Sequence, residues 1–346
     1  MAKRTYPKIG ISVLAASLLG PALGLGQGCV CQRQGSPFFG GINPYMGKGE
    51  SQLTLYYRGY ESTEHFQGRN PLPELDPNGP NNRQNYFNID ATYAWSRKWS
   101  FSLGVPIEFN TFSVRRQPPG GGDRVWAPIH SSGFGDVTVR ARYWLFSTEN
   151  PNHNVGVTFG VKAPTGKANR TDEYFGRPVP VDVSVQTGDK SWAPTTGVYG
   201  FQQLGPITAY AVASYLSNPR NTTGVPTFFG SLNNPNNRQV NSAADQYSVQ
   251  MGGSANIKPR WPVPSLIYRI EGVPIRDLFG ASDGFRRPGV IGFVEPGLSY
   301  AIGRHMFSAG LGIRSYVNIK DSPTSTRVED ATVPKLVFTA AYSLRF

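Results

Sequence analysis

The fold is decided by the segment Trp99-Ser-Phe-Ser-Leu-Gly-Val-Pro-Ile-Glu-Phe109, in which apolar and polar positions alternate. Its odd-numbered positions carry only large apolar side chains, whereas its even-numbered positions carry Ser, Gly, Pro and Glu. Successive side chains of a β-strand point to opposite sides of the sheet. The segment is therefore predicted to form a strand with one apolar face and one polar face.

The same alternation recurs along the chain after Gly49, where no amphipathic helix of useful length is found. It predicts about twelve strands, each close to the roughly ten residues that a tilted strand needs to cross a bilayer. The expected strands are 51–60, 85–95, 99–110, 134–147, 154–164, 191–202, 207–216, 244–256, 264–274, 289–301, 306–317 and 333–346.

The connections between these strands alternate between short and long. The short ones are 96–98, 148–153, 203–206, 257–263 and 302–305, and the long ones are 61–84, 111–133, 165–190, 217–243, 275–288 and 318–332. Outer-membrane barrels show this asymmetry, because they have tight periplasmic turns and long extracellular loops. The sequence thus predicts an all-β protein that forms a closed antiparallel transmembrane β-barrel of about twelve strands.

In a barrel of this kind the apolar rows face lipid and the polar rows face the lumen. The residues expected to line the lumen are Asp90, Glu108, Arg140, Arg142, Lys162, Arg269, Glu271 and Arg314, and Lys335 and Arg345 are expected on the same polar rows. The basic residues of these rows have two interpretations. They favour anionic solutes by raising their local concentration, or they pair with neighbouring carboxylates and fix the inner wall.

The N-terminal segment has the pattern of an export signal. Lys3, Arg4 and Lys8 precede an uncharged, apolar stretch that ends in small residues near Gly26 and Gly28. This is the order of a secretory signal peptide. We therefore expect a signal peptide over 1–28, a periplasmic arm or plug over 29–49, and the barrel over 50–346. Cys29 and Cys31 have no assigned role, since a single Cys-x-Cys pair supplies too few ligands for a metal site.

Composition excludes several other classes of protein. Charged residues make up 16% of the chain and aromatic residues 12%, which is not the composition of a disordered protein. Two cysteines among 346 residues exclude a disulfide scaffold. A net charge of +12 suggests nucleic acid as a partner of a soluble protein, but export to the envelope removes that partner. The basic loop residues expected to contact anionic lipopolysaccharide instead are Arg115, Arg116, Arg124, Arg286 and Arg287.

The last expected strand alternates up to the end of the sequence. Tyr342, Leu344 and Phe346 lie on its apolar face, with Ser343 and Arg345 on the other. A closing strand that ends in Phe resembles the C-terminal signal read by the bacterial barrel-assembly machinery. We expect that machinery as a partner and these three residues as its assembly signal.

Three segments resemble one family of bacterial outer-membrane barrels. They are Gly133-Phe-Gly-Asp-Val-Thr-Val-Arg-Ala-Arg-Tyr-Trp-Leu-Phe146, Gly160-Val-Lys-Ala-Pro-Thr-Gly-Lys167 and Val294-Glu-Pro-Gly-Leu-Ser-Tyr-Ala-Ile-Gly303. The chain looks like the transporter group named after a meta-cleavage pathway of phenol degradation, over roughly residues 85 to 346. The resemblance implies a barrel that passes small solutes, often aromatic or apolar ones.

The function predicted from these features is passive or facilitated passage of small molecules through the outer membrane, with no cofactor and no metal. The alternative is a structural or adhesive barrel that acts through its extracellular loops. An enzyme is not expected, because the four histidines form no recognisable catalytic arrangement in the sequence. Only His65 and His130, in long loops, keep a hydrolase at the barrel rim open as a hypothesis.

Overall fold

The computed structural model describes residues 44–346 apart from 75, 78, 229–239, 258–260 and 324–329. The expected signal peptide over 1–28 and the pair Cys29 and Cys31 lie outside the described residues. Of the arm expected over 29–49, only 44–49 are described.

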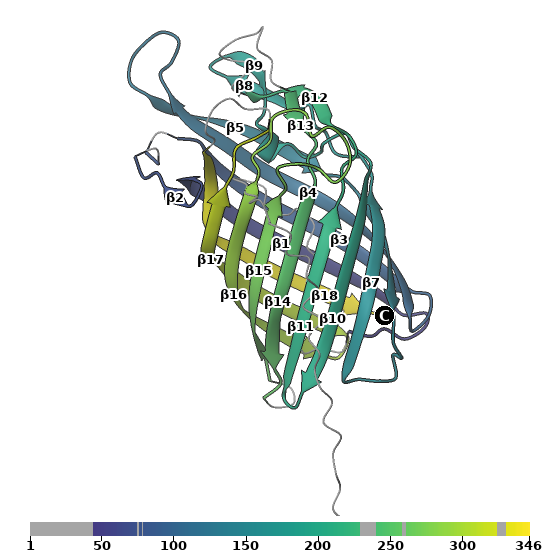
Figure 1. Cartoon of the computed structure of the whole chain (residues 1–346). Coiled ribbons are helices and arrows are strands. Elements are labelled where there is room, and N and C mark those ends of the chain that lie inside the picture. The colour runs from purple at the N-terminus through teal and green to yellow at the C-terminus, as the bar shows by residue number, and fades with distance from the viewer. Residues whose placement is uncertain (1–43, 75, 78, 229–239, 258–260, 324–329) are drawn as a thin grey trace, which may run out of the picture.

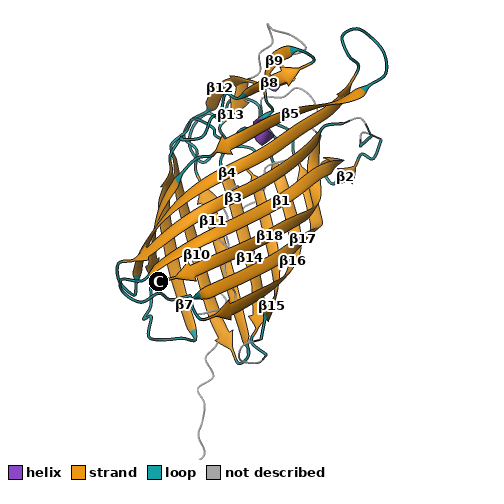
Figure 2. Cartoon of the chain, turned by 180° about the vertical axis from the view of Figure 1, so that it is seen from behind, coloured by secondary structure: helices purple, strands orange, loops and turns teal. Residues whose placement is uncertain are grey.

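Twelve antiparallel strands close into one barrel (Figures 1 and 2). They are β1 (Ser51–Gln67), β3 (Asn81–Ala94), β4 (Trp99–Arg116), β6 (Thr138–Trp144), β7 (His153–Lys162), β10 (Ala193–Leu204), β11 (Ile207–Leu216), β14 (Gln246–Ala255), β15 (Val263–Val273), β16 (Gly289–Ile302), β17 (His305–Ile319) and β18 (Ala331–Arg345). Each strand pairs with its neighbour along the chain, and β18 closes the ring by pairing with β1. The predicted fold class is confirmed.

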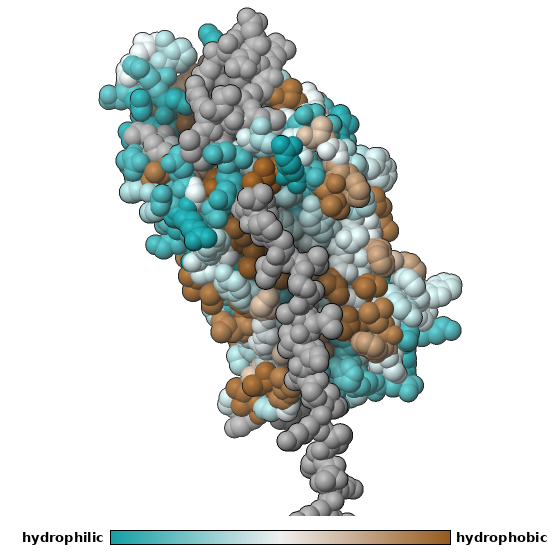
Figure 3. Space-filling view, viewed as in Figure 1, coloured by the Kyte–Doolittle hydropathy of each residue, from teal (hydrophilic) through white to brown (hydrophobic). Residues whose placement is uncertain are grey.

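The apolar rows face outward and the polar rows face inward. On β4 the exposed fraction is 45% for Leu103 but 2% for Glu108. On β3 the exposed fraction is 39% for Ile89 and 7% for Asp90. Apolar residues, drawn in brown, are frequent over the wall strands in Figure 3, and hydrophilic residues cover much of the end that carries the long loops. A surface of this kind is stable against hydrocarbon, because lipid tails meet apolar side chains while every barrel strand has its backbone groups paired.

The two ends of the barrel differ as predicted. Short turns join β3 to β4, β6 to β7, β10 to β11, β14 to β15 and β16 to β17, and we call this the short-turn end. The opposite, long-loop end carries β2 (Asn70–Pro71), β5 (Val125–Phe134), β8 (Thr171–Tyr174), β9 (Arg177–Pro180), the 3-10 turn η1 (Val183–Val185), β12 (Thr222–Pro226) and β13 (Val240–Ser242). No helix in the described part of the chain is long and apolar enough to span a membrane.

The strands extend further toward the long-loop end than the sequence predicts. The expected loop 111–133 is largely a hairpin, since β4 runs to Arg116 and pairs with β5 as far as Val125. The hairpins β8–β9 and β12–β13 also lie in segments expected to be loops. Beyond Asn110 the apolar side chains of β4, Phe112 and Val114, face inward instead of outward, so the period-two pattern reverses its faces although the backbone pairing continues.

The C-terminal strand lies where the sequence predicts it. Its even-numbered residues from Phe338 to Phe346 face outward, and Phe346 is 62% exposed. The backbone N–H groups of Ser51 and Phe346 each donate to the other residue's carbonyl, at 2.8 and 2.9 Å. Phe346 therefore takes part in the backbone pairing of β18 with β1 that closes the barrel.

An arginine on the outward face should cost stability according to its depth. We predict that Leu103→Arg, within the outward apolar row of β4 from Trp99 to Phe109, destabilises the barrel by about 2–4 kcal/mol because the charge must enter hydrocarbon. Val125→Arg, at the hairpin of β4 and β5, should cost less than about 0.5 kcal/mol. Reversible denaturant titration of the protein folded into lipid vesicles measures both. Equal costs at the two positions would contradict the outward orientation of Leu103.

Candidate functional site

The charged residues of the inward rows form ion pairs. Arg269 on β15 donates from Nη1 to Glu271 Oε2 at 2.6 Å and from Nε to Glu295 Oε2 at 2.9 Å. Arg58 on β1 donates from Nη2 to Glu271 Oε1 at 2.7 Å. Glu271 is 1% exposed, and a carboxylate at that burial is tolerated only with charged partners. The four residues form one network, which we call the lumen network.

The lumen network spans the inside of the barrel. Three strands, β16, β17 and β18, separate β15 from β1 in the sheet, so Arg58 and Glu271 do not lie on adjacent strands. Next to them lies a cavity of about 80 Å³, lined by polar residues that include Ser248, Gln250 and Ser308. A cavity with several polar partners can hold ordered water. The middle of the lumen is therefore polar and only partly filled.

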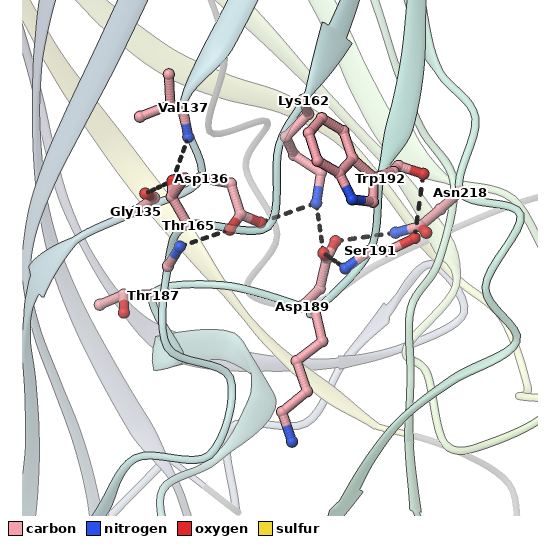
Figure 4. Close-up of polar contacts among 12 residues, drawn as sticks. Gly135, Asp136, Val137, Lys162, Thr165, Thr187, Asp189, Ser191, Trp192 and Asn218 are labelled. Atoms are coloured by element: carbon pink, nitrogen blue, oxygen red, sulfur yellow. Dashed lines mark hydrogen bonds and ion pairs between the residues drawn. The ribbon is translucent and has the colours of Figure 1, made fainter.

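A second set of ion pairs holds the β7–β10 connection to the wall. Lys162, at the end of β7, contacts the carboxylates of both Asp136 and Asp189 (Figure 4), and its distance to Asp136 Oδ2 is 2.8 Å. Asp136 belongs to the wall between β5 and β6, whereas Asp189 belongs to the connection. Asp189 also accepts a hydrogen bond from Asn218 Nδ2 at 2.9 Å. Lys162 thus joins the connection to the wall through a buried charge.

Residues 181–191 of this connection lie inside the barrel, and we call them the plug segment. Gln84 of β3 donates from Nε2 to the Ser184 carbonyl at 2.8 Å, and Ser184 Oγ donates to Asn82 Oδ1 at 3.1 Å. Asn110 of β4 donates to the Val185 carbonyl at 3.3 Å. Because Asn82, Gln84 and Asn110 belong to inward rows, the segment that they contact occupies the lumen.

Apolar residues cover the plug segment on the side of the long-loop end. Val181 and Val185 of the plug segment have no exposed surface and pack in a cluster whose other buried members are Phe112, Val114, Ile129, Tyr174, Val179 and Phe228. The ring centroids of Phe112 and Phe228 lie 5.1 Å apart. Loops distant in sequence therefore meet above the plug segment and close over this part of the barrel mouth.

Most of the predicted lumen residues lie inside the barrel with a charged partner. Arg140 pairs with Asp90, and Arg314 pairs with Glu64. Glu108 is buried and accepts a hydrogen bond from Asn110 Nδ2 at 2.8 Å. The guanidinium carbon of Arg142 lies 4.8 Å from the centroid of the Tyr199 ring. The observed contacts match the interpretation in which the basic residues fix the inner wall.

Two expectations about basic residues are wrong. Lys335 is 73% exposed in its side chain, because Lys335 and Leu336 are both exposed at an interruption of the alternation in β18. Arg286 and Arg287 are not surface residues, since they are 3% and 8% exposed. Arg286 Nη2 lies 2.6 Å from Asp277 Oδ2, and Arg287 Nη1 lies 3.2 Å from Asp182 Oδ1. Arg286 therefore stabilises its own loop, whereas Arg287 joins this loop to the connection between β7 and β10.

Asp245 shows how the long loops are joined. Its carboxylate accepts hydrogen bonds from Tyr215 Oη at 2.6 Å and from the backbone N–H of Leu278 at 2.7 Å. Burial raises the pKa of the Asp245 carboxyl, although these hydrogen bonds oppose the shift. The loop between β11 and β14 is thereby connected to the loop between β15 and β16.

The two loop histidines each lie beside an aspartate. His65 Nδ1 lies 2.8 Å from Asp76 Oδ1, and His130 Nδ1 lies 3.4 Å from Asp172 Oδ2. Neither ring is hydrogen-bonded to a hydroxyl or thiol of the described residues, although a serine or cysteine hydrolase needs such a nucleophile beside its base. The described part of the chain also contains no group of three or more His, Cys, Asp or Glu side chains placed to hold a metal ion.

The sequence did not reveal Arg58, the plug segment or the partners of Lys162. Arg58 carries the signal of an inward row, because it alternates with outward Tyr57 and follows Thr54 and Tyr56 on the same face. Asp189 carries no such signal, since it lies in a long loop and reaches Lys162 only through the tertiary fold.

Comparisons with known proteins agree with the barrel geometry. A family model described as "Putative MetA-pathway of phenol degradation" matches residues 112–193, which include β5, β6, β7 and the plug segment. The family resemblance is confirmed over these residues. No curated protein matches the sequence.

Among solved structures, an outer membrane channel from Pseudomonas putida is similar at a TM-score of 0.62 with 13% identity, over 90% of this chain and 100% of that one. The toluene transporter TbuX of Ralstonia pickettii is similar at a TM-score of 0.42 with 10% identity, over 87% of this chain and 90% of that one. A FadL homologue of Pseudomonas aeruginosa follows at 0.40 with 9% identity, over 86% and 90%. At these identities the likeness to the Pseudomonas putida channel shows the fold.

The contact between Lys162 and Asp189 should control how easily the plug segment leaves the lumen. We predict that Asp189→Ala raises the rate at which a thiol reagent labels Ser184→Cys by at least about tenfold, because hydrogen bonds to a charged group contribute about 1.5–3 kcal/mol each. Cys29 and Cys31 are replaced by Ser in the background. The exposed loop variant Asp123→Ala serves as the control and should leave the rate unchanged. An unchanged rate in Asp189→Ala would show that this contact does not hold the segment.

Proposed function

We propose that this protein is a channel of the Gram-negative outer membrane, which gives small solutes passive passage when the plug segment leaves the lumen. The observation that carries the proposal is the nature of the contacts between the plug segment and the wall. Toward the lumen they are hydrogen bonds and ion pairs from Asn82, Gln84, Asn110 and Lys162, which water can replace. Val181 and Val185 form the apolar part of the contact, in the cluster on the side of the long-loop end. The polar part supports reversible movement, because water compensates for each hydrogen bond that breaks.

The contacts of the plug segment determine how often it leaves the lumen. A hydrogen bond inside a protein contributes roughly 0.5–1.5 kcal/mol net, and one to a charged group about 1.5–3 kcal/mol. A minor state a few kcal/mol above the major one is populated at about 0.1–10%. Opening breaks several of these bonds and exposes Val181 and Val185, so the open state is expected to be less populated than this.

The arrangement of charge supports passage of small solutes without strong charge selection. The lumen network contains two arginines, Arg58 and Arg269, and two glutamates, Glu271 and Glu295. A preference for anions would require those arginines to be free of their carboxylates. We therefore extend the proposal to small uncharged solutes, apolar and aromatic ones included.

The remaining parts of the proposal concern delivery and surroundings. The signal peptide over 1–28 directs export, and Tyr342, Leu344 and Phe346 present an outward apolar row to the assembly machinery. Arg115, Arg116 and Arg124 belong to the β4–β5 hairpin at the long-loop end, where they would meet lipopolysaccharide. No catalytic step is part of the proposal.

Tethering the plug segment tests the proposal. Asn82→Cys with Ser184→Cys places two thiols where the side chains now form a hydrogen bond of 3.1 Å. In a background with Cys29 and Cys31 replaced by Ser, oxidation should abolish most opening events in planar bilayers, and reduction should restore them. Each single cysteine variant should be insensitive to oxidation. Equal conductance in both redox states would exclude the plug segment as a gate. Absence of conductance in both the oxidised and the reduced protein would favour an adhesive barrel.

Removing the carboxylates of the lumen network should change ion selectivity. Glu271→Gln combined with Glu295→Gln removes two negative charges beside Arg58 and Arg269 at nearly constant side-chain volume. We predict that the anion-to-cation permeability ratio rises about twofold or more, because the charge of the lumen becomes more positive and attracts anions. Reversal potentials in a salt gradient measure the ratio, and Glu149→Gln in an exposed turn is the control. A shift toward cations would contradict a solute path along the network.

A further inference from the structure

Four aromatic side chains turn into the lumen at the short-turn end. They are Trp144 of β6, Tyr199 and Phe201 of β10, and Tyr210 of β11, and none is more than 7% exposed. Trp144 shares an inward row with Arg140 and Arg142, whereas Val139 of the same strand is 50% exposed on the outside. We call these four residues the aromatic box.

A fifth aromatic ring, which is partly buried, packs against the aromatic box from outside the sheet. Tyr45 lies in the segment before β1 and belongs to no strand. Its ring centroid lies 5.0 Å from that of Trp144 and 5.8 Å from that of Phe201, and both contacts are edge-to-face. This is the spacing and orientation that attract aromatic rings to one another. The segment before β1 thus packs a phenol ring against the aromatic cluster of the barrel wall.

Two asparagines beside the aromatic box form hydrogen bonds with the hydroxyl group of Tyr45. Tyr45 Oη accepts a hydrogen bond from Asn154 Nδ2 at 3.0 Å and donates one to the Asn150 carbonyl at 2.9 Å. Asn154 is the second residue of β7 and pairs with Phe201, and Asn150 lies in the turn before β7. The site therefore offers ring edges, one donor and one acceptor in the arrangement that a phenol requires.

The box is held in place by contacts that do not involve Tyr45. The centroids of Trp144 and Tyr199 lie 4.7 Å apart, and the guanidinium of Arg142 covers the Tyr199 ring. Gly156 makes room for that ring, since a Cβ atom at this position would lie 2.2 Å from it. A site formed by paired strands keeps its shape when its occupant leaves.

We propose that the aromatic box is a binding site for a phenolic ring on the solute path, and that Tyr45 is its built-in occupant. This inference rests on the proposed function, because the box lies inside the lumen. A free solute has to displace Tyr45 to bind, so the arm before β1 competes with the solute. A tethered competitor acts at a millimolar effective concentration, and it lowers the apparent affinity for the free ligand accordingly.

Binding of phenol to the full chain in detergent micelles tests the proposal. Titration followed by saturation-transfer NMR should show phenol binding at least about tenfold tighter to Tyr45→Ala than to the unsubstituted protein. Tyr45→Ala with Trp144→Leu should lose this binding, because leucine keeps apolar volume without a ring. Tyr45→Ala with Trp192→Ala should keep it, since Trp192 is 62% exposed and outside the box. If Trp144→Leu fails to fold, Phe201→Leu replaces it.

The outcomes separate recognition from simple partitioning. Cyclohexanol, which matches phenol in size but has no aromatic ring, should bind more weakly than phenol to Tyr45→Ala. Equal binding of the two, or no gain on removing Tyr45, would overturn the assignment. Binding is measured without conduction, so the two proposals can fail separately. A protein that binds phenol but never conducts would reject the proposed function and support the site. A protein that conducts but does not bind phenol would reject the site and support the proposed function.

Discussion

The structure depends on the difference between hydrocarbon outside the barrel and a polar space within it. Outward rows such as Phe101 and Leu103 meet lipid, so the rows between them have to face the interior. A ring of twelve strands is too wide for those inward side chains to fill as an apolar core would be filled. The interior is therefore polar, and its charges have to be neutralised within it.

Neutralisation explains both the lumen network and the inserted segment. Arg58 reaches Glu271 from a strand that does not adjoin it, and Lys162 takes a carboxylate from the β7–β10 connection as well as from the wall. A buried ion pair has to offset the loss of hydration of both ions. Bringing the plug segment inward adds hydrogen-bond partners for Asn82, Gln84 and Asn110. The contacts that hold the plug segment in the lumen are thus the same contacts that provide hydrogen-bond partners for the polar side chains of the wall.

The features that could be predicted from the sequence are those that depend on local alternation of apolar and polar residues. The strand 99–110, the outward row that ends in Phe346 and the inward position of Arg269 all follow from a period of two, because lipid enforces it at each step. The same rule failed at Lys335, where the alternation of β18 is interrupted. The expectation that Arg286 is exposed in a loop failed for another reason, because it pairs with Asp277 of the same loop. The contact between Gln84 and Ser184 joins residues one hundred positions apart. No local pattern encodes it, so the plug segment could be recognised only in three dimensions.

The most direct test of this account is a cysteine scan of consecutive positions on β4 in lipid vesicles. Single cysteines at Phe101, Ser102 and Leu103 are labelled with a small fluorophore, and quenching by brominated lipid tails is measured. The account predicts strong quenching at Phe101 and Leu103 and weak quenching at Ser102. Strong quenching at Ser102 with protection of its two neighbours would contradict it.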